Sequence, residues 1–393
     1  MDRIDELLAR GVETIVPNKT ELEKVLRSGK KLNIYNGVDP TAVRIHLGHA
    51  VPLRKLQLLV ELGHNVIFLI GDFTAFIGDT SDKNSERPQL SEGQIEENWQ
   101  TYKKQAEKIL DFSKVRIVRN SEWLDKLTFR DAIKMARHFS LNDFIGRELI
   151  KKRLTEGGSV NLAEVLYPLA QGYDSYHLET DLQIGGTEQI FNIQAGRTLI
   201  KDLNNKESYI MTLSTLEGTD GRKMSKSWGN ALWIEDTPEE MFGKTMSLRD
   251  DLIVQYFLLA TDLSLGKVSE AKRRLESGEN PMVLKKELAY EIVSELHSRE
   301  AADKAREEFE TTFQKKKPEE ANIPAQTVRE GDWIVEKLLL ETGLAPSVSE
   351  VTRLINGGAV ELNGEKITDH NAHVEIKKGS FIRVGKRKFL KII

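Results

Sequence analysis

The chain has 393 residues, of which 39% are hydrophobic and 30% charged, and its formal net charge is −4. This length is more than one hydrophobic core usually supports, so two or three domains are expected. The sequence contains no cysteine, which excludes disulfides, thiolate catalysis and zinc sites with cysteine ligands. Because the overall charge is slightly negative, a nucleic acid would have to be held by local basic patches.

The first residues and the hydrophobic runs indicate where the protein works. Residues 1–8 are acidic and amphipathic, which is typical of neither a signal peptide nor an organellar transit peptide. No apolar run approaches the roughly 20 residues that span a membrane as a helix. We therefore expect a cytoplasmic protein with no membrane attachment.

Strands and helices alternate along the first part of the chain. Residues 32–38 are predicted to form a strand, residues 47–62 a helix, and the continuous apolar run 65–70 a strand buried on both faces. A strand–helix–strand unit of this length predicts a parallel sheet. The alternation continues with a helix at 92–110, a strand at 115–119, a strand at 182–186, a helix from Thr187 and a strand at 208–214.

The segment at about 121–180 has a mostly helical pattern and interrupts this alternation. The sequence therefore predicts an α/β domain over residues 1–232, with a doubly wound, Rossmann-like parallel sheet and a helical insertion. Residues 233–325 are predicted to form an α-helical domain. A helix start at 236–240 contains a capping residue, a proline and acids, and amphipathic helices follow at 281–298 and 299–313.

The end of the chain has a different character. Residues 315–324 have the lysine- and proline-rich composition of a linker. Residues 332–393 are predicted to form a small α+β domain, with helices at 332–341 and 347–356. A hairpin turning through Asn363-Gly364 follows these helices, and this dipeptide is a strong hairpin signal.

Two short motifs about 175 residues apart suit one nucleotide site. His46-Leu47-Gly48-His49 opens a predicted helix, so both imidazoles lie where helix amides attract anions. Lys223-Met224-Ser225-Lys226-Ser227 follows a glycine-rich turn and supplies two ammonium groups. A capping pair of histidines and a solvated lysine loop are the alternative interpretation. The presence of both motifs in one chain favours a site for a polyphosphate whose charge rises during reaction.

These motifs match the two signatures of class I aminoacyl-tRNA synthetases. The chain resembles the tyrosyl-tRNA synthetase family over essentially its full length, through residues 35–42, 77–79, 167–174 and 185–189. The resemblance implies a tyrosine–tRNA ligase, which makes tyrosyl-adenylate and pyrophosphate from tyrosine and ATP. The enzyme then transfers tyrosine to the 3′-terminal adenosine of its tRNA. It also implies Mg²⁺ that arrives with ATP, no tightly bound cofactor, no dedicated metal site and a homodimer formed through the insertion. The helical domain at 233–325 would bind the tRNA anticodon.

The resemblance also implies a role for individual residues. Tyr35 and Asp174 would bind the tyrosine phenol, and the ammonium and its surroundings would be held by Asp79, Tyr167, Gln171 and Gln189. ATP would be bound by Asp39, Gly48, Glu188 and Lys226. The catalytic groups would be His46, His49, Lys223, Lys226 and Ser227, with Lys83 and Arg87 as a second clamp on the leaving pyrophosphate.

Two observations on the residues themselves bear on these roles. Tyr167, Gln171 and Asp174 lie at i, i+4 and i+7, so they share one helical face. Core aromatic residues and a helix-end acid are the alternative interpretation. Glu188 departs from the family, which usually has Asp at this position, so its carboxylate reaches one methylene further.

The C-terminal segment resembles a small RNA-binding module shared with a ribosomal small-subunit protein. The matching residues are Ser347, Ser349, Arg353, Gly357, Gly358, Val360, Asn363 and Gly364. Residues 377–393 contain seven basic residues and no acid, the composition of a surface that contacts phosphates. The predicted RNA contacts are Arg353, Lys386, Arg387 and Lys388.

Three other functions are considered. A tryptophan–tRNA ligase of the same class is disfavoured because an indole offers no hydroxyl to Tyr35 and Asp174. A small nucleotidyltransferase would share the histidine motif but lacks the helical and RNA-binding parts. A synthetase-like RNA-binding protein without catalysis would not need the intact histidines and lysines.

Overall fold

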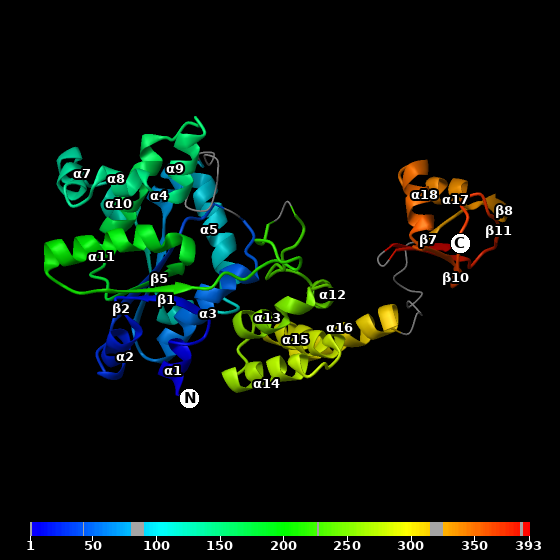
Figure 1. The fold of residues 1–393 in the computed structure, drawn as a ribbon, viewed down its shortest axis with the longest axis horizontal. Helices are drawn as coiled ribbons and strands as arrows, with labels where there is room; N and C mark the ends of the chain where they lie inside the picture. Colours follow the sequence, from blue (N-terminus) through cyan, green and yellow to red (C-terminus); the bar gives the residue numbers. More distant parts are fainter. Residues whose placement is uncertain (1, 42, 80–89, 226–227, 315–324, 386–387) are drawn as a thin grey trace. The chain divides into compact units, whose positions relative to one another are not determined.

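A computed structural model describes residues 2–41, 43–79, 90–225, 228–314, 325–385 and 388–393. The chain divides into two compact units, Met1–Arg306 and Glu307–Ile393 (Figure 1). The first unit contains the large sheet and most of the helices, and the second contains a five-stranded sheet, a two-stranded sheet and two complete α-helices.

The first unit is built on a six-stranded sheet with the strand order β1-β6-β5-β2-β3-β4. These strands are β1 (Val12–Val16), β6 (Tyr209–Leu213), β5 (Leu182–Gly186), β2 (Asn33–Val38), β3 (Asn65–Ile70) and β4 (Arg116–Arg119). All neighbours from β6 to β4 are parallel, so the predicted doubly wound parallel sheet is confirmed for them. The unpredicted edge strand β1 pairs antiparallel with β6, which makes the sheet mixed.

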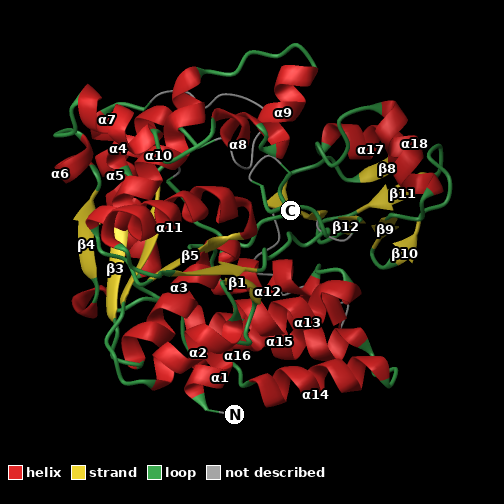
Figure 2. Ribbon diagram, turned by 60° about the vertical axis from the view of Figure 1, so that its left-hand side comes forward, coloured by secondary structure: helices red, strands yellow, loops and turns green. Residues whose placement is uncertain are grey.

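Alternating side chains of β3 pack on opposite faces of the sheet, as expected for a strand buried on both sides. Phe68 lies 5.6 Å from Trp99 of α5 (Glu92–Ala106), measured between ring centroids. Ile67 and Leu69 belong to a buried cluster with Trp123 on the other face. Helices therefore cover both faces (Figure 2).

The strand order reverses direction beside β2, because α3 (Leu47–Glu61) leads from β2 to β3, whereas β5 lies on the other side of β2. In such sheets ligands bind at the carboxyl ends of the strands at this switch point. The histidine motif, at the start of α3, lies just after the carboxyl end of β2.

The segment between β4 and β5 is helical, as predicted for the insertion. It contains α6 (Ser121–Leu124), α7 (Phe129–Ala136), α8 (Leu141–Ile145), α9 (Glu148–Thr155) and α10 (Leu162–His177). Capping boxes fix the starts of α7 and α10, through Thr128 with Asp131 and Asn161 with Glu164. Helix α10 packs on α11 (Ile190–Asn204), where Gly172 lies close to the backbone of Ala195.

Further helices complete the first unit. At its start are α1 (Arg3–Leu7) and α2 (Lys19–Arg27), which the sequence pattern did not indicate, and α4 (Asp72–Ile77) follows β3. After the sheet come α12 (Pro238–Met246), α13 (Ile253–Ala260), α14 (Leu265–Glu276), α15 (Pro281–Leu296) and α16 (Arg299–Phe309), of which the last residues, from Glu307, belong to the second unit. The predicted helix start is present, since Thr237 caps α12 and Pro238 is its first residue. The predicted linker, 315–324, lies outside the described residues.

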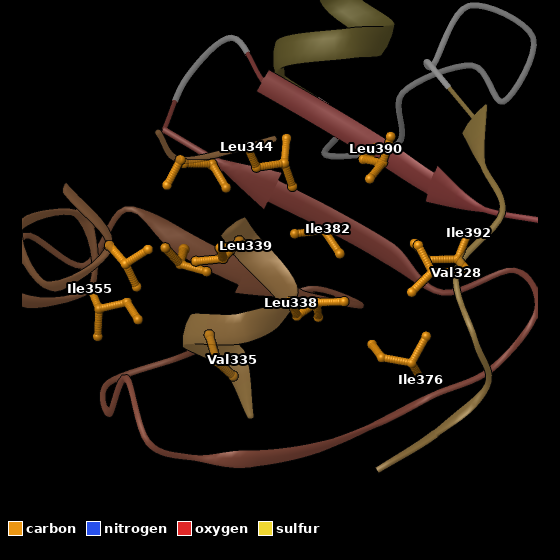
Figure 3. Close-up of a cluster of buried hydrophobic side chains, with 14 residues drawn as sticks. Val328, Val335, Leu338, Leu339, Leu344, Ile355, Ile376, Ile382, Leu390 and Ile392 are labelled. Atoms are coloured by element: carbon orange, nitrogen blue, oxygen red, sulfur yellow. The ribbon is translucent and has the colours of Figure 1, made fainter. Parts of the chain in front are cut away.

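The second unit has its own hydrophobic core, formed by residues such as Val335, Leu338, Leu339, Ile382 and Ile392 (Figure 3). Its helices are α17 (Val335–Glu341) and α18 (Val348–Asn356). A five-stranded sheet has the order β10-β9-β12-β13-β7, with β10 (Glu365–Lys366), β9 (Val360–Leu362), β12 (Phe381–Val384), β13 (Lys388–Ile392) and β7 (Ala325–Gln326). The strands β8 (Gly331–Ile334) and β11 (His373–Ile376) form a separate pair.

Two details of this unit compare directly with the sequence predictions. The predicted hairpin is confirmed, because β9 and β10 turn through Asn363 and Gly364, both with positive φ. The prediction of a helix from residue 332 is wrong at its start, since residues 332–334 belong to β8 and the helix begins at Val335. The reason is the pairing of β8 with β11, which lies some 40 residues further along the chain.

Candidate active site

The histidine motif forms the first turn of α3. His46 is the residue that caps the helix: its Nδ1 accepts a hydrogen bond from the Gly48 amide at 3.1 Å. The His46 amide in turn donates to Nδ1 of His49 at 3.2 Å. The two imidazole rings lie 3.9 Å apart, measured between centroids. Gly48 fits beneath them, since a Cβ there would lie 2.9 Å from the His46 ring.

This arrangement fixes what the two rings can do chemically. Burial, aided by the nearby His49 and Lys223, lowers the pKa of His46 to about 3, so this ring is neutral near pH 7. A neutral imidazole carries one N–H, and Nδ1 of His46 is already used as an acceptor. The proton of His46 therefore lies on Nε2, where it is available to a ligand. Nδ1 of His49 also accepts an amide, so His49 likewise carries a proton on Nε2.

The lysine motif follows a tight hairpin, in which Glu217 bridges to Lys223 and the Gly218 amide donates to the Arg222 carbonyl at 2.7 Å. Gly221 makes the turn with φ of +83°, which favours glycine. Met224 is buried, whereas Lys223 is exposed and lies close enough to His46 to lower the pKa of that ring. The hairpin thus brings an ammonium group to the histidine motif.

The residues predicted to bind a phenol lie on β2 and α10. Tyr35 is buried, and its hydroxyl lies 3.0 Å from Oγ of Ser175 and 3.4 Å from the Gln171 carbonyl, to which it donates. Asp174 is also buried. Its carboxylate accepts from Nε1 of Trp123 at 2.8 Å and from Nδ2 of Asn120 at 3.1 Å. Burial raises the pKa of Asp174 to about 7, against these two donors.

The residues predicted to hold an ammonium and a nucleotide are linked by hydrogen bonds. Nε2 of Gln189 donates to Asp79 at 2.6 Å. Asp39, at the end of β2, accepts from the Tyr167 hydroxyl at 2.9 Å and from Thr74 at 2.7 Å. Burial and the charges of Asp39 and Asp79 raise the pKa of Tyr167 well above its usual value. These side chains place two carboxylates beside a neutral tyrosine hydroxyl, a suitable environment for a cation.

Glu188 lies in a short 3-10 helix, Thr187–Gln189, that directly follows β5. Its side chain is exposed, and its carboxylate folds back over Gly186, where any Cβ would collide with it. The longer side chain at this position is therefore accommodated by glycine in the preceding strand.

The chain is similar to known proteins both in sequence and in structure. Residues 27–314 match the family model of class I tRNA synthetases (W and Y), and residues 335–378 match the S4 domain. The chain is 46% identical to the tyrosine–tRNA ligase of Carboxydothermus hydrogenoformans, with 99% of this chain and 97% of the relative covered. Identity to the Thermotoga maritima tyrosine–tRNA ligase is 43%, with 98% and 96% covered.

The chain belongs to the tyrosyl-tRNA synthetases. A similar fold occurs in a C-terminally truncated mitochondrial tyrosyl-tRNA synthetase of Aspergillus nidulans, with a TM-score of 0.65, 23% identity and coverage of 79% of this chain and 94% of that chain. The Archaeoglobus fulgidus tyrosyl-tRNA synthetase complexed with L-tyrosine has a TM-score of 0.61 and 25% identity, with coverage of 78% and 100%. The predicted tyrosine–tRNA ligase with a C-terminal RNA-binding module is therefore confirmed.

Not every predicted site residue of this tyrosyl-tRNA synthetase can be placed. Lys83, Arg87, Lys226, Ser227, Lys386 and Arg387 lie outside the described residues. Of the predicted RNA contacts, Arg353 is exposed on α18 and pairs with Glu350 at 2.6 Å. Nζ of Lys388 donates to the Leu344 carbonyl at 3.1 Å, and Arg353 and Lys388 together lower the pKa of Glu350. These two basic residues therefore flank the same carboxylate.

Several residues at the tyrosyl-tRNA synthetase site were missed by the sequence analysis. Asn120 and Trp123 hold the Asp174 carboxylate, Thr74 holds Asp39, and Asn230 binds the lysine hairpin. Asn120 follows the carboxyl end of β4, a position that could have marked it as a site residue. The other three carry no signal in sequence, because their partners lie far away or in an irregular loop.

Within the described ranges, no three His, Asp or Glu side chains are grouped in a way that could hold a metal ion. None of the helices that the structure describes is long and apolar enough to cross a membrane.

Proposed function

We propose that the groups at the carboxyl edge of the large sheet carry out both steps of tyrosine–tRNA ligation. The observation that carries this assignment is the contact between the two motifs. The chain just after the lysine loop pairs with the histidine motif, because the Leu47 amide donates to the Leu232 carbonyl at 2.9 Å and the Ile234 amide to the Ile45 carbonyl at 3.1 Å. The neutral imidazole of His46, the neighbouring His49 ring and an ammonium group thereby face one polyphosphate.

In the first step, the tyrosine carboxylate attacks the α-phosphorus of ATP and the bond from that phosphorus to the bridging oxygen breaks, releasing pyrophosphate. Negative charge increases on the phosphate oxygens in the transition state. The Nε2–H groups of His46 and His49 and the ammonium of Lys223 stabilise this charge, and Lys226, Ser227, Lys83 and Arg87 act with them. No protein nucleophile is involved, so catalysis rests on orientation and charge.

In the second step, a hydroxyl of the 3′-terminal adenosine of tRNA attacks the activated carbonyl, and AMP leaves. ATP enters with Mg²⁺ as a substrate complex. Asp39, Gly48 and Glu188 bind its adenosine and ribose. No further cofactor is required, since both steps are displacements at phosphorus and at carbonyl carbon.

Specificity for tyrosine arises at the phenol end of the site. Tyr35 and Asp174 hydrogen-bond the phenol, and both are buried, so an analogue that lacks the hydroxyl would displace water from this end of the site without making these two hydrogen bonds. Asp79, Tyr167, Gln171 and Gln189 hold the ammonium end. Two observations support this assignment. The carboxylate of Asp79 is held by Gln189, and the raised pKa of Tyr167 keeps its hydroxyl neutral. An ammonium would therefore meet a carboxylate together with neutral oxygen acceptors.

The insertion carries exposed apolar side chains that fit a homodimer. Phe129, Ile133, Leu141, Leu162 and Leu166 are 83%, 50%, 65%, 70% and 45% exposed. A second copy of the chain would cover them, since large apolar surfaces of this kind mark protein contacts. The tRNA binds the S4 domain through phosphate contacts of residues that include Arg353 and Lys388, and the enzyme works in the cytoplasm, where tRNA is charged.

The experiment that tests this function is pyrophosphate exchange with each of the twenty amino acids. Exchange should require ATP and tyrosine and should be slow with phenylalanine and tryptophan. Faster exchange with tryptophan would replace the proposed substrate. Tyrosine binding without exchange would favour a synthetase-like protein that lacks catalysis.

A further inference from the structure

The side chain of Asn230 binds both Asp220 and Ser225, which lie on either side of Lys223 in the lysine loop (residues 217–230). It is 3% exposed. Its Oδ1 accepts from the Ser225 amide at 2.9 Å, and its Nδ2 donates to the Lys223 carbonyl at 3.1 Å. Nδ2 also donates to Oδ1 of Asp220 at 2.8 Å.

These contacts use the amide fully and fix its orientation. A primary amide has two N–H donors and a carbonyl acceptor. A backbone N–H requires the oxygen, whereas a carbonyl and a carboxylate require the nitrogen, so the reversed amide would oppose every partner. The backbone of Asn230 adds a fourth contact, because its carbonyl accepts from the Thr219 amide at 3.0 Å. Gly218 leaves room for this close approach, since a Cβ there would collide with the Asn230 side chain.

Asn230 is also tied to the histidine motif through the chain that follows it. Leu232, two residues further on, accepts a hydrogen bond from the Leu47 amide, and Trp233 bridges to His46. The segment from Asn230 to Trp233 is therefore paired with the histidine motif at its end. At its start, Asn230 binds Asp220 before Lys223 and Ser225 after it. Any change in the position of Asn230 relative to Lys223 changes the distance from the ammonium group to the imidazoles.

We infer that Asn230 is a positioning residue, which sets the place of Lys223 against His46 and His49 for the phosphoryl step. This inference rests on the proposed action of Lys223 on ATP. Two further side chains contact residues 217–220 of the hairpin: the Tyr256 hydroxyl donates to the Glu217 carbonyl at 2.6 Å and Arg249 to the Asp220 carbonyl at 3.3 Å. Asn230 reaches the residues on both sides of the lysine.

The test compares Asn230→Ala, Asn230→Asp, Lys223→Ala and the double variant Asn230→Ala with Lys223→Ala in the full-length protein. Asn230→Asp keeps the shape and an acceptor for Ser225 but loses both donors. Pyrophosphate exchange gives kcat and the KM for ATP, and equilibrium binding gives the affinity for tyrosine. Thr245→Ala is the control, because Thr245 is also buried and the hydroxyl that the substitution removes donates within α12, to the Met241 carbonyl.

Both Asn230 variants should lower kcat by about 10- to 100-fold, since small displacements of a catalytic group have effects of this size. Tyrosine affinity should stay within about twofold of the wild type. The double variant should be about as slow as Lys223→Ala alone, because residues that act as a unit are not additive. Thr245→Ala should exchange at the wild-type rate.

The positioning role would be overturned if the fold-loss of kcat in the double variant equalled the product of the losses in the two single variants. A wild-type kcat for Asn230→Asp would overturn it as well. Loss of tyrosine affinity together with kcat in both Asn230 variants would also overturn it, by showing a general structural role. A wild-type rate for Lys223→Ala would instead contradict the proposed function of the lysine loop. The two failures are therefore distinguishable.

Discussion

At the scale of single residues, Asp174 combines full burial with two hydrogen-bond donors. Trp123 and Asn120 donate to its carboxylate, yet burial dominates and raises the pKa of Asp174 to about 7. A buried carboxyl with this pKa changes its charge near neutral pH, so it can accept or donate towards a phenol. The family motif identifies Asp174 in the sequence. Its partners come from the segment after β4, so no local pattern indicates them.

Removing either side chain of the proposed phenol site, Tyr35 or Asp174, should weaken discrimination between tyrosine and phenylalanine. In Tyr35→Phe and Asp174→Asn, the ratio of kcat/KM values for tyrosine and phenylalanine should fall by about tenfold or more, because a lost buried hydrogen bond is worth roughly 1–3 kcal/mol. Adenylate formation with each amino acid measures this ratio. The KM for ATP serves as the internal control and should not change. An unchanged ratio would remove these two residues from the phenol site.

The raised pKa of Asp174 also makes stability depend on pH. The folded protein keeps its Asp174 proton up to about pH 7, whereas the unfolded chain loses it near the usual pKa of 3.8. Unfolding therefore releases a proton between these values, so the Asp174 contribution to the free energy of unfolding falls as pH rises from about 4 to about 7. Above pH 7 the contribution stays constant.

Asp174→Asn cannot titrate, which isolates this effect from other groups. The free energy of unfolding of the variant minus that of the wild type should increase by about 2–3 kcal/mol between pH 5 and pH 8. Urea unfolding at the two pH values measures this difference. If wild type and variant change in parallel, the pKa of Asp174 is not raised in the folded state.

At the scale of elements, prediction succeeded where one segment carries its own signal. The strand β3 was predicted because its own sequence is a continuous apolar run, which indicates burial on both faces. The hairpin was predicted because the dipeptide Asn363-Gly364 itself favours a tight turn. The strands β1 and β8 were not predicted. Each is short and only partly buried, and each exists because it pairs with a distant strand, β6 for β1 and β11 for β8.

The helices of the insertion are joined by an ion pair between α9 and α10. Arg153 lies 2.7 Å from Glu164, and both side chains are less than a tenth exposed. Glu164→Ala would leave a buried guanidinium without its carboxylate and should reduce the free energy of unfolding by about 3–5 kcal/mol. Denaturant unfolding at a fixed protein concentration measures the loss.

The matched control is an exposed pair in another helix, Lys272 with Glu276, whose side chains are 60% and 63% exposed. Glu276→Ala should change the free energy of unfolding by less than about 1 kcal/mol, because solvent screens exposed pairs. Equal losses in the two variants would mean that the Arg153–Glu164 pair does not hold the insertion together.

At the scale of the whole molecule, the order of the domains along the chain can be predicted from changes in composition. The residues at which the C-terminal domain begins cannot. The C-terminal module was predicted to begin at residue 332. The structure includes β7 and the buried Val328 in the second unit, so its fold uses residues before that point. The class I family model ends at residue 314, before the segment 315–324. The composition of a segment does not show whether its residues pack on a core formed by distant residues.

A protein that ends at residue 314 should therefore separate the two half-reactions. Pyrophosphate exchange should proceed at the rate of the intact chain, because adenylation involves no RNA and the site residues of the large sheet are all retained. Transfer of tyrosine to tRNA should fall steeply, through a higher KM for tRNA, because the S4 domain is missing. Binding of tRNA by the full-length protein should weaken with salt, as phosphate contacts release counterions.

The full-length Arg353→Ala variant tests RNA binding without removing the C-terminal unit. It removes one exposed cation and leaves the core of that unit intact. It should exchange pyrophosphate normally and bind tRNA less tightly than wild type, with a smaller salt dependence. If the protein ending at residue 314 charges tRNA as well as the intact chain at physiological salt, the C-terminal unit does not hold the substrate. If that protein loses exchange as well, the unit supports the fold of the catalytic part, and its role in binding RNA has to be measured in the full-length variant alone.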